Sequence, residues 1–359
     1  MVTVTRRTFL SGLSLLLLAE LPACDMTEAD ERNAGGQRPG TATLANGISL
    51  SISPGRVRTV DGAVVVRAAS PTPEIALSAA AGEARFRLAN VQPGSSFNPP
   101  PASRQTVGPT TVEFVYQVPT QGLRIRVQPP GAGPARFALI SDLHNNLETF
   151  GRFTEAVEEW QPDAALCMGD IADHGKPEEL DQMLALFDAL PVPFYTTVGN
   201  HDLMGAAADR FDEVIGPTNV AFDLRGVRIV LADTANALFS PGAYGWLADS
   251  LVRDGGPALV FSHIPPLEPW GGRNHAFSNR DDALHFVQVI AQGGATHYFA
   301  GHIHSYADYT MRDVPSTIAG GGGGSMEAML GQGHFFMKLV VDPYSATQPL
   351  SMERVGLDE

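Results

Sequence analysis

Cysteine is nearly absent from this 359-residue chain, which contains only Cys24 and Cys167. Two cysteines cannot form a disulfide framework, so the sequence excludes the disulfide-rich class of small secreted domains. Cys24 closes the segment "LPAC" near the N-terminus. Cys167 lies within the apolar run "AALCMG", and we expect it to be a small core residue.

Positive charge is also scarce, because 24 Lys and Arg residues face 39 Asp and Glu residues and the formal net charge is −15. A field of this sign repels phosphate backbones, and we therefore expect no nucleic-acid partner. A small phosphate ester can still bind such a protein where metal ions supply local positive charge. The length and the 44% hydrophobic content are enough for two separate cores.

Long hydrophobic runs are missing as well. The apolar run over residues 13–19 is too short for a transmembrane helix, and it follows the pair Arg6 and Arg7. The segment "TRRTFL" resembles a twin-arginine export signal, and "LPAC" is similar to a lipoprotein cleavage box. We predict an export signal over residues 1–23 and a location in the periplasm or cell envelope. Cys24 is then either a lipid-carrying residue that anchors the protein to the membrane or an incidental residue after a cleaved signal.

Changes of composition divide the rest of the chain. A polar, Gly-rich stretch, residues 24–43, predicts a flexible linker. Short alternating runs such as "TTVEFVYQV" then predict a β-sandwich domain over residues 44–131. Strand-like apolar runs alternate with helical periodicity over residues 135–342, which predicts an α/β catalytic domain. We expect residues 343–359 to be a C-terminal tail.

Five strand-like segments of the predicted catalytic domain end in Asp, Asn or His. The endings are "SDLH", "MGD", "GNHD", "SH" and "GHIH". Ligand-binding residues of α/β sheets gather beyond the carboxyl ends of the strands, so we expect these side chains to meet. They supply seven candidate metal ligands: Asp142, His144, Asp170, Asn200, His263, His302 and His304.

The residue types in these endings favour metal binding. Positions i and i+2 of an extended chain face the same side, so "SDLH" and "GHIH" can each offer two ligands to one centre. Imidazole and carboxylate suit Zn, Fe, Mn, Co or Ni. Seven donors are more than one ion needs, and a carboxylate such as Asp170 can bridge two ions, which predicts a two-metal site. Any one of these residues alone is typical of a helix cap, a turn or a hydrogen-bonded core histidine.

Together the five endings resemble the pattern of the calcineurin-like metallophosphoesterase superfamily over residues 137–305. The resemblance implies a four-layer αββα sandwich for the α/β domain. The small all-β domain before it, of immunoglobulin or fibronectin III type, is similar to the layout of purple acid phosphatases. In the family's pattern one ion would bind Asp142, His144, Asp170 and His304, and the other would bind Asp170, Asn200, His263 and His302.

The resemblance also implies a role for His201, which would stand outside the metal ions and protonate the leaving group. Asp202 is a hypothetical partner that orients it. Purple acid phosphatases carry a metal-binding Tyr three residues after the "GD" aspartate, where this sequence has Asp173. The metal pair therefore stays open among Fe, Mn, Zn and Ni.

Other residues support less specific predictions. His174 and His275 are candidates for lining the pocket. The five consecutive glycines at 320–324 predict a tight loop in which the backbone needs room or unusual dihedral angles. Three histidines lie in helix or strand patterns and are expected to be structural: His285, His297 and His334.

These observations predict an exported phosphoesterase with a dinuclear metal centre, which hydrolyses small phosphate mono- or diesters through a metal-activated hydroxide, with His201 as general acid. One alternative is a diesterase specific for cyclic nucleotides or phospholipid headgroups. A second alternative is a non-catalytic envelope protein that uses the same scaffold to bind a ligand or partner. The sequence leaves the substrate, the role of the β domain and the oligomeric state open.

Overall fold

The computed structural model describes residues 26–36, 38–270, 275–327, 332–345 and 347–358. The predicted export signal over residues 1–23, together with Cys24, lies outside this part of the chain. Within the described ranges, no helix has the length and apolar character needed to cross a membrane.

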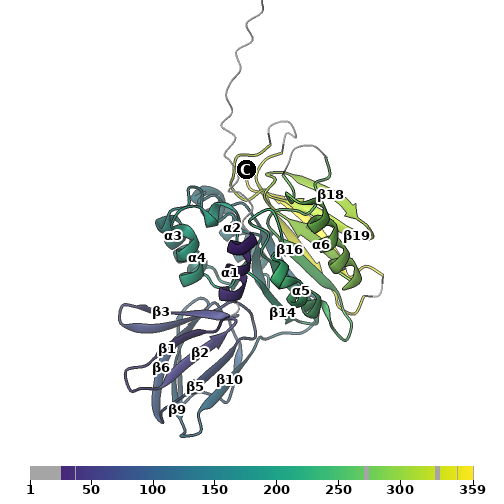
Figure 1. Cartoon of the computed structure of the whole chain (residues 1–359). Helices are drawn as coiled ribbons and strands as arrows, with labels where there is room; N and C mark the ends of the chain where they lie inside the picture. Colours follow the sequence, from purple (N-terminus) through teal and green to yellow (C-terminus); the bar gives the residue numbers. More distant parts are fainter. Residues whose placement is uncertain (1–25, 37, 271–274, 328–331, 346, 359) are drawn as a thin grey trace, which may run out of the picture.

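Residues 40–128, called the β unit below, form two five-stranded sheets around one hydrophobic core (Figure 1). Along the core-facing side of one strand, Val112, Phe114, Tyr116 and Val118 alternate with more exposed residues, as period-2 patterning requires. The likeness to immunoglobulin or fibronectin III domains stays a prediction. The first sheet runs β1 (Gly40–Thr43), β2 (Ser49–Ser53), β5 (Glu74–Ser78), β10 (Leu123–Gln128) and β7 (Ser96–Asn98). The second runs β3 (Gly55–Val60), β4 (Ala63–Ala68), β6 (Gly82–Ala89), β9 (Thr111–Val118) and β8 (Ser103–Gly108).

Residues 135–356, called the α/β unit, contain two more sheets, and helices cover their outer faces (Figure 1). The first sheet runs β13 (Phe194–Thr196), β12 (Ala164–Cys167), β11 (Ala135–Ile140), β20 (Phe335–Val341) and β21 (Leu350–Gly356). The second runs β14 (Val220–Leu224), β15 (Val227–Ala232), β16 (Ala258–Ser262), β17 (His297–Ala300), β19 (Val314–Ala319) and β18 (Tyr306–Met311). Strands β11, β12 and β13 are parallel to one another, as are β15, β16, β17 and β19.

Five helices of the α/β unit flank these sheets, and local signals explain where several of them begin. The side chain of Asn146 accepts a hydrogen bond from Thr149 N at 3.2 Å and caps α2. Asn279 caps α6 in the same way, and Pro177 occupies the first position of α3, where its missing N–H is not needed. The helices are α2 (Leu147–Trp160), α3 (Pro177–Ala189), α4 (Ala207–Val214), α5 (Tyr244–Leu251) and α6 (Arg280–Gln292).

Three buried clusters of apolar side chains hold the α/β unit together as four layers. On β11, Phe137 and Leu139 face the cluster between the two sheets, whereas Ala138 and Ile140 face the cluster under α2, α3 and α4. A third cluster lies between the second sheet and helices α5 and α6. This is the αββα arrangement that the resemblance implied.

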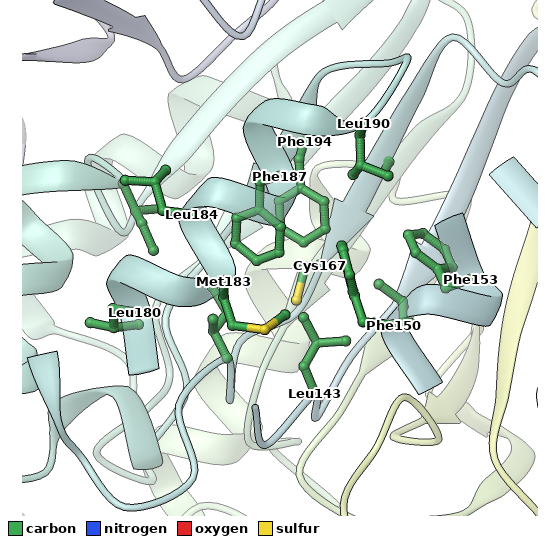
Figure 2. Close-up of a cluster of buried hydrophobic side chains, with 14 of the residues drawn as sticks. Leu143, Phe150, Phe153, Cys167, Leu180, Met183, Leu184, Phe187, Leu190 and Phe194 are labelled. Carbon is green, nitrogen blue, oxygen red and sulfur yellow. The ribbon is translucent and has the colours of Figure 1, made fainter. Parts of the chain in front are cut away.

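Figure 2 shows the cluster under α2 and α3, which is rich in aromatic rings. The rings of Phe187 and Phe194 stack with centroids 3.9 Å apart, and Phe150 meets Phe187 edge to face at 5.5 Å. Cys167 lies among them with no exposed surface, so the prediction that it is a small core residue is confirmed.

The predicted flexible linker over residues 24–43 is wrong where the structure describes it. The chain forms α1 (Met26–Gly36), which packs against the short helix η2 (Pro241–Ala243). Arg32 is mostly buried there, and its Nε donates to Asp233 Oδ2 at 2.7 Å. The polar composition suggested disorder, but this ion pair with the α/β unit supplies the stabilisation that an isolated short helix lacks.

The predicted C-terminal tail over residues 343–359 is also wrong in part. Its second half forms β21, which pairs antiparallel with β20 along its whole length and is the edge strand of the first sheet. A single polar strand of this kind gives a weak sequence signal, because its stability comes from the ladder to a neighbour.

The β unit contacts the α/β unit at the amino ends of the strands. Asn90 donates to Phe194 O at 3.0 Å and accepts from Phe194 N at 2.7 Å, and Phe194 is the first residue of β13. Gln92 donates to Asp163, which immediately precedes β12. The β unit therefore lies at the edge of the sheets opposite to the carboxyl ends of these strands.

Candidate metal centre

All seven predicted ligands lie just beyond the carboxyl ends of parallel strands. Three of these strands belong to the first sheet and two to the second, so both sheets deliver side chains to one edge. In chain order the ligands are Asp142 and His144 after β11, Asp170 after β12, Asn200 after β13, His263 after β16, and His302 and His304 after β17.

The structure gathers these side chains into two adjoining clusters. In the first cluster, ligand atoms of Asp142, His144, Asp170 and His304 all lie within 4.8 Å of one another. In the second cluster, the same holds for Asp170, His263 and His302. Asn200 joins the second cluster, because its Oδ1 lies 2.9 Å from Nε2 of His263.

Asp170 belongs to both clusters and lies between them. Its Oδ2 is 3.5 Å from Nε2 of His144 and 3.2 Å from Nε2 of His263. A carboxylate in this place can serve two cations at once, which is the bridging role expected of it.

Tight backbone turns aim these side chains inward. Asp142, His144, Asp170 and His302 have φ angles of 60°, 46°, 53° and 65°, in the left-handed region that non-glycine residues rarely adopt. Such residues store about 1–3 kcal/mol each and persist only where other contacts hold them. Here Asp142 N donates to Gly169 O and His144 N donates to Asp170 O, both at 3.0 Å, so the loops after β11 and β12 hold each other.

The electrostatics of the centre suit cations. Burial opposes the ionisation of Asp170, but the imidazoles of His263 and His144 outweigh it and hold its pKa well below the usual value. Burial likewise opposes protonation of His263, but the facing Asp170 carboxylate prevails and raises its pKa to about 9. Asp142 Oδ2 is buried and has no hydrogen-bond partner among the described residues. A buried carboxylate oxygen without a partner is costly, and a bound cation would satisfy it, so the residues fit a metal centre.

The glycines at 320–324 form one wall of this centre. Gly322 N and Gly324 N donate to Ser141 O at 2.8 Å and to Asp142 O at 2.9 Å. A Cβ atom on Gly324 would lie 2.3 Å from Cε1 of His304 and 2.7 Å from Cδ2 of His144. The prediction of a loop in which the backbone needs room is therefore confirmed, and close approach is the reason.

His201 stands beside the first cluster, with its ring centroid 4.5 Å from that of His144. Its Nδ1 lies 2.6 Å from Asp173 O, a carbonyl that can only accept, so Nδ1 carries a proton. This main-chain contact orients the ring.

Asp202 does not perform the orienting role that the sequence suggested. Its buried carboxylate accepts from the backbone N–H groups of Ile171, Ala172 and Gly199 at 2.8–2.9 Å. Burial and the nearby Asp170 charge raise the pKa of Asp202 to about 7. Asp202 thus ties the loop after β12 to the loop after β13.

Asp173 has a contact that the sequence did not reveal. Its Oδ1 lies 3.0 Å from Nδ1 of His144, the ring nitrogen that faces away from Asp170 and His304. Metal-binding histidines commonly donate this second N–H to a carboxylate, which fixes their tautomer. The sequence signal for Asp173 was its position three residues after Asp170. Its partner His144 follows another strand, so the spacing alone did not reveal the contact.

Four other histidines lie outside the two clusters. His275 lies at the edge of the second cluster, with its ring 5.7 Å from that of His302, and His174 is 65% exposed and contacts Asp173. His285 packs on the ring of Tyr244. His297 is the first residue of β17 in the second sheet, and its burial lowers its pKa to about 4.

Comparisons with known proteins agree with this geometry. Residues 135–306 match the family described as "Calcineurin-like phosphoesterase". The glycerophosphodiester phosphodiesterase GpdQ of Enterobacter lignolyticus is 30% identical over 183 residues, which cover 44% of this chain and 63% of that protein. A probable cyclic nucleotide phosphodiesterase of Fibrobacter succinogenes is 28% identical over 172 residues, or 43% of this chain and 64% of that protein. The chain thus spans less than two thirds of either relative.

A solved structure shows the same fold. The purple acid phosphatase PPD1 from seeds of yellow lupin (Lupinus luteus) superposes with a TM-score of 0.57, over 86% of this chain and 72% of that chain, at 12% sequence identity. At this identity the likeness concerns the fold alone. Combined with the family match and the clustered carboxylates and imidazoles, it establishes a mixed α/β metallophosphoesterase fold. By its family match, the part of this chain that carries the metal centre, residues 135–306, is a calcineurin-like phosphoesterase domain.

Proposed function

We propose that this protein hydrolyses small phosphate esters with two bound metal ions, drawn from Fe, Mn, Zn and Ni. The observation that carries the proposal is the pair of ligand clusters that share the Asp170 carboxylate. One cluster would be the site of the first ion, and the second cluster together with Asn200 would be the site of the other.

The bound ions would supply positive charge for the phosphoryl oxygens and would lower the pKa of bound water towards about 7. The chain's own residues supply the other requirements. Asp142 and Asp170 place buried carboxylates at the centre. Because Nδ1 of His201 is engaged with Asp173 O, Nε2 is the nitrogen that can give a proton to the leaving alkoxide. A general acid of this kind contributes about 10²–10⁴-fold in rate.

Phosphodiesters are the substrate class that we favour. Both curated relatives described above carry the name phosphodiesterase, one for glycerophosphodiesters and one for cyclic nucleotides. The β unit contacts the opposite edge of the sheets, so the edge that carries the candidate ligands stays free of it. A non-catalytic binding protein on this scaffold is less well supported, because such a protein has no need to retain seven ligands and His201.

The decisive experiment measures metal content and hydrolysis together. Full-length protein purified without added metal should contain close to two ions per chain by mass spectrometry and should hydrolyse bis(p-nitrophenyl) phosphate faster than p-nitrophenyl phosphate. Asp170→Asn should lose both metal and activity, because it contributes to both clusters. A wild-type protein that binds no ion from the candidate set, or that binds ions and hydrolyses neither ester, would refute the proposal.

We propose further that the protein is exported and held at the cell envelope through Cys24. The supporting observations are the segments "TRRTFL" and "LPAC". Replacing Arg6 and Arg7 with lysines should retain the protein in the cytoplasm, and Cys24→Ala should move it from the membrane to the soluble periplasmic fraction. Unchanged fractionation of both variants would contradict export and anchoring.

A further inference from the structure

The last described residues of the chain, Leu357 and Asp358, contact His334, which in turn contacts the glycine wall of the metal centre. Leu357 follows β21, and its N donates to His334 O at 2.8 Å. Arg152 of α2 donates to Leu357 O at 2.7 Å, and His334 N donates to Asp358 Oδ2 at 2.6 Å. These three contacts fix Asp358 against His334, which lies immediately before β20.

The imidazole of His334 lies between two oxygen atoms that only accept hydrogen bonds. Its Nδ1 is 2.7 Å from Asp358 Oδ1, and its Nε2 is 3.0 Å from Gly324 O. Each contact is a hydrogen bond when the ring nitrogen that makes it carries a proton. The ring thus bridges the Asp358 carboxylate and the Gly324 carbonyl.

The backbone segment that His334 contacts also contacts a predicted metal ligand one residue further on. Ser325 O lies 2.8 Å from Nδ1 of His304, so it accepts the proton of the nitrogen that does not face the centre. On the other side, Gly324 N donates to Asp142 O at 2.9 Å, and the absence of a Cβ on Gly324 lets the loop touch the His304 ring. The backbone of Gly324 and Ser325 is therefore held by His334 on one side and contacts His304 on the other.

We propose that His334 and Asp358 are positioning residues that orient the His304 imidazole for metal binding through the backbone of Gly324 and Ser325. This inference rests on the proposed metal-dependent function. The contacts end on His304, which belongs to the first cluster, and they do not reach His263 or His302 of the second cluster. Loss of the pair should therefore weaken one metal site and spare the other, which a purely stabilising contact would not do.

The test is a calorimetric titration of metal-free, full-length protein with Mn²⁺. Wild type should show two binding steps, and His304→Ala identifies the step that belongs to the first cluster. His334→Gln and Asp358→Asn should weaken that step about 3- to 10-fold, somewhat less than the roughly 10–100-fold loss that follows removal of a direct partner of a metal ligand. The other step should change by less than about 2-fold. Asp313→Asn, an exposed carboxylate in the turn between β18 and β19, is the matched control and should leave both steps unchanged.

Each outcome separates the inference from the proposed function. Two unchanged steps in both variants, with wild type binding two ions, would overturn the inference alone. Equal weakening of both steps, together with a lower melting temperature of the metal-free protein, would reduce His334 and Asp358 to a stabilising contact and would also overturn it. A wild type that binds no Mn²⁺, Zn²⁺, Fe²⁺ or Ni²⁺ would remove the proposed function and the inference with it. Because the Asp358 side chain is 47% exposed, Asp358→Asn should fold even where His334→Gln does not.

Discussion

Replacing Gly324 with alanine tests how closely the glycine wall supports the metal centre. The added Cβ would lie 2.3 Å from Cε1 of His304 and 2.7 Å from Cδ2 of His144. Carbon atoms in contact are about 3.5–4.0 Å apart, so the rings or the loop would have to move by roughly 1 Å. Overpacking of this kind typically costs about 1–3 kcal/mol. At about 1.4 kcal/mol per factor of ten, the metal affinity of the first cluster should fall about 5- to 150-fold.

The assay is competition for Zn²⁺ or Mn²⁺ with a chromophoric chelator. Gly151→Ala is the matched control, because Gly151 lies within α2 and an added Cβ there meets no atom within 4 Å. Alanine at that exposed helical position should raise stability by up to about 1 kcal/mol and leave metal affinity unchanged. Wild-type affinity in a Gly324→Ala protein that melts like wild type would refute the close-packing argument.

Three further predictions concern other parts of the molecule. His201→Ala should lower kcat on a poor leaving group about 10²–10⁴-fold and leave metal content unchanged, and full activity would disprove the general-acid role. Asn90→Ala should destabilise the protein by about 2–5 kcal/mol in urea unfolding, because it leaves the buried N–H and C=O of Phe194 without their hydrogen-bond partner. The control Asn46→Ala, at an exposed contact, should change stability by less than about 1 kcal/mol. Burial lowers the pKa of His297 from 6.5 to about 4, so between these pH values the unfolded chain binds more protons than the folded protein. The contribution of the neutral, buried His297 to the free energy of unfolding is therefore lost as pH falls from about 6.5 to 4. His297→Gln should therefore gain up to about 3 kcal/mol relative to wild type over that range, and parallel pH curves would contradict the assignment.

The gathering of the candidate ligands was predictable because their positions follow from a general property of parallel strands. Asp142, Asp170 and His263 each come directly after a short apolar run, and parallel runs place their carboxyl ends at one edge. The layer order was implied by the family resemblance, and the side chains of β11 alternate between two of the buried clusters in agreement with it. In these cases the information is local, and the fold only brings the segments together.

The missed features depend on partners that are remote in sequence. α1 has few apolar residues, and its helix is held by Arg32 bonding to Asp233, 201 positions away. The role of Asp202 was misassigned because its carboxylate accepts from Ile171 N and Ala172 N of the loop after β12, as well as from Gly199 N of its own loop. His334 looked like an ordinary strand residue, since neither Asp358 nor the Gly324 carbonyl is near it in the chain.

The docking of α1 has a mechanical consequence. α1 precedes the β unit and β11 follows it, yet both pack within the α/β unit. Two covalent crossings therefore join the units, which removes the free swivelling that a single linker permits. A force applied to the chain ahead of α1 would act directly on the α/β unit through the Arg32–Asp233 pair. The β unit would not carry that force and would not serve as a spacer.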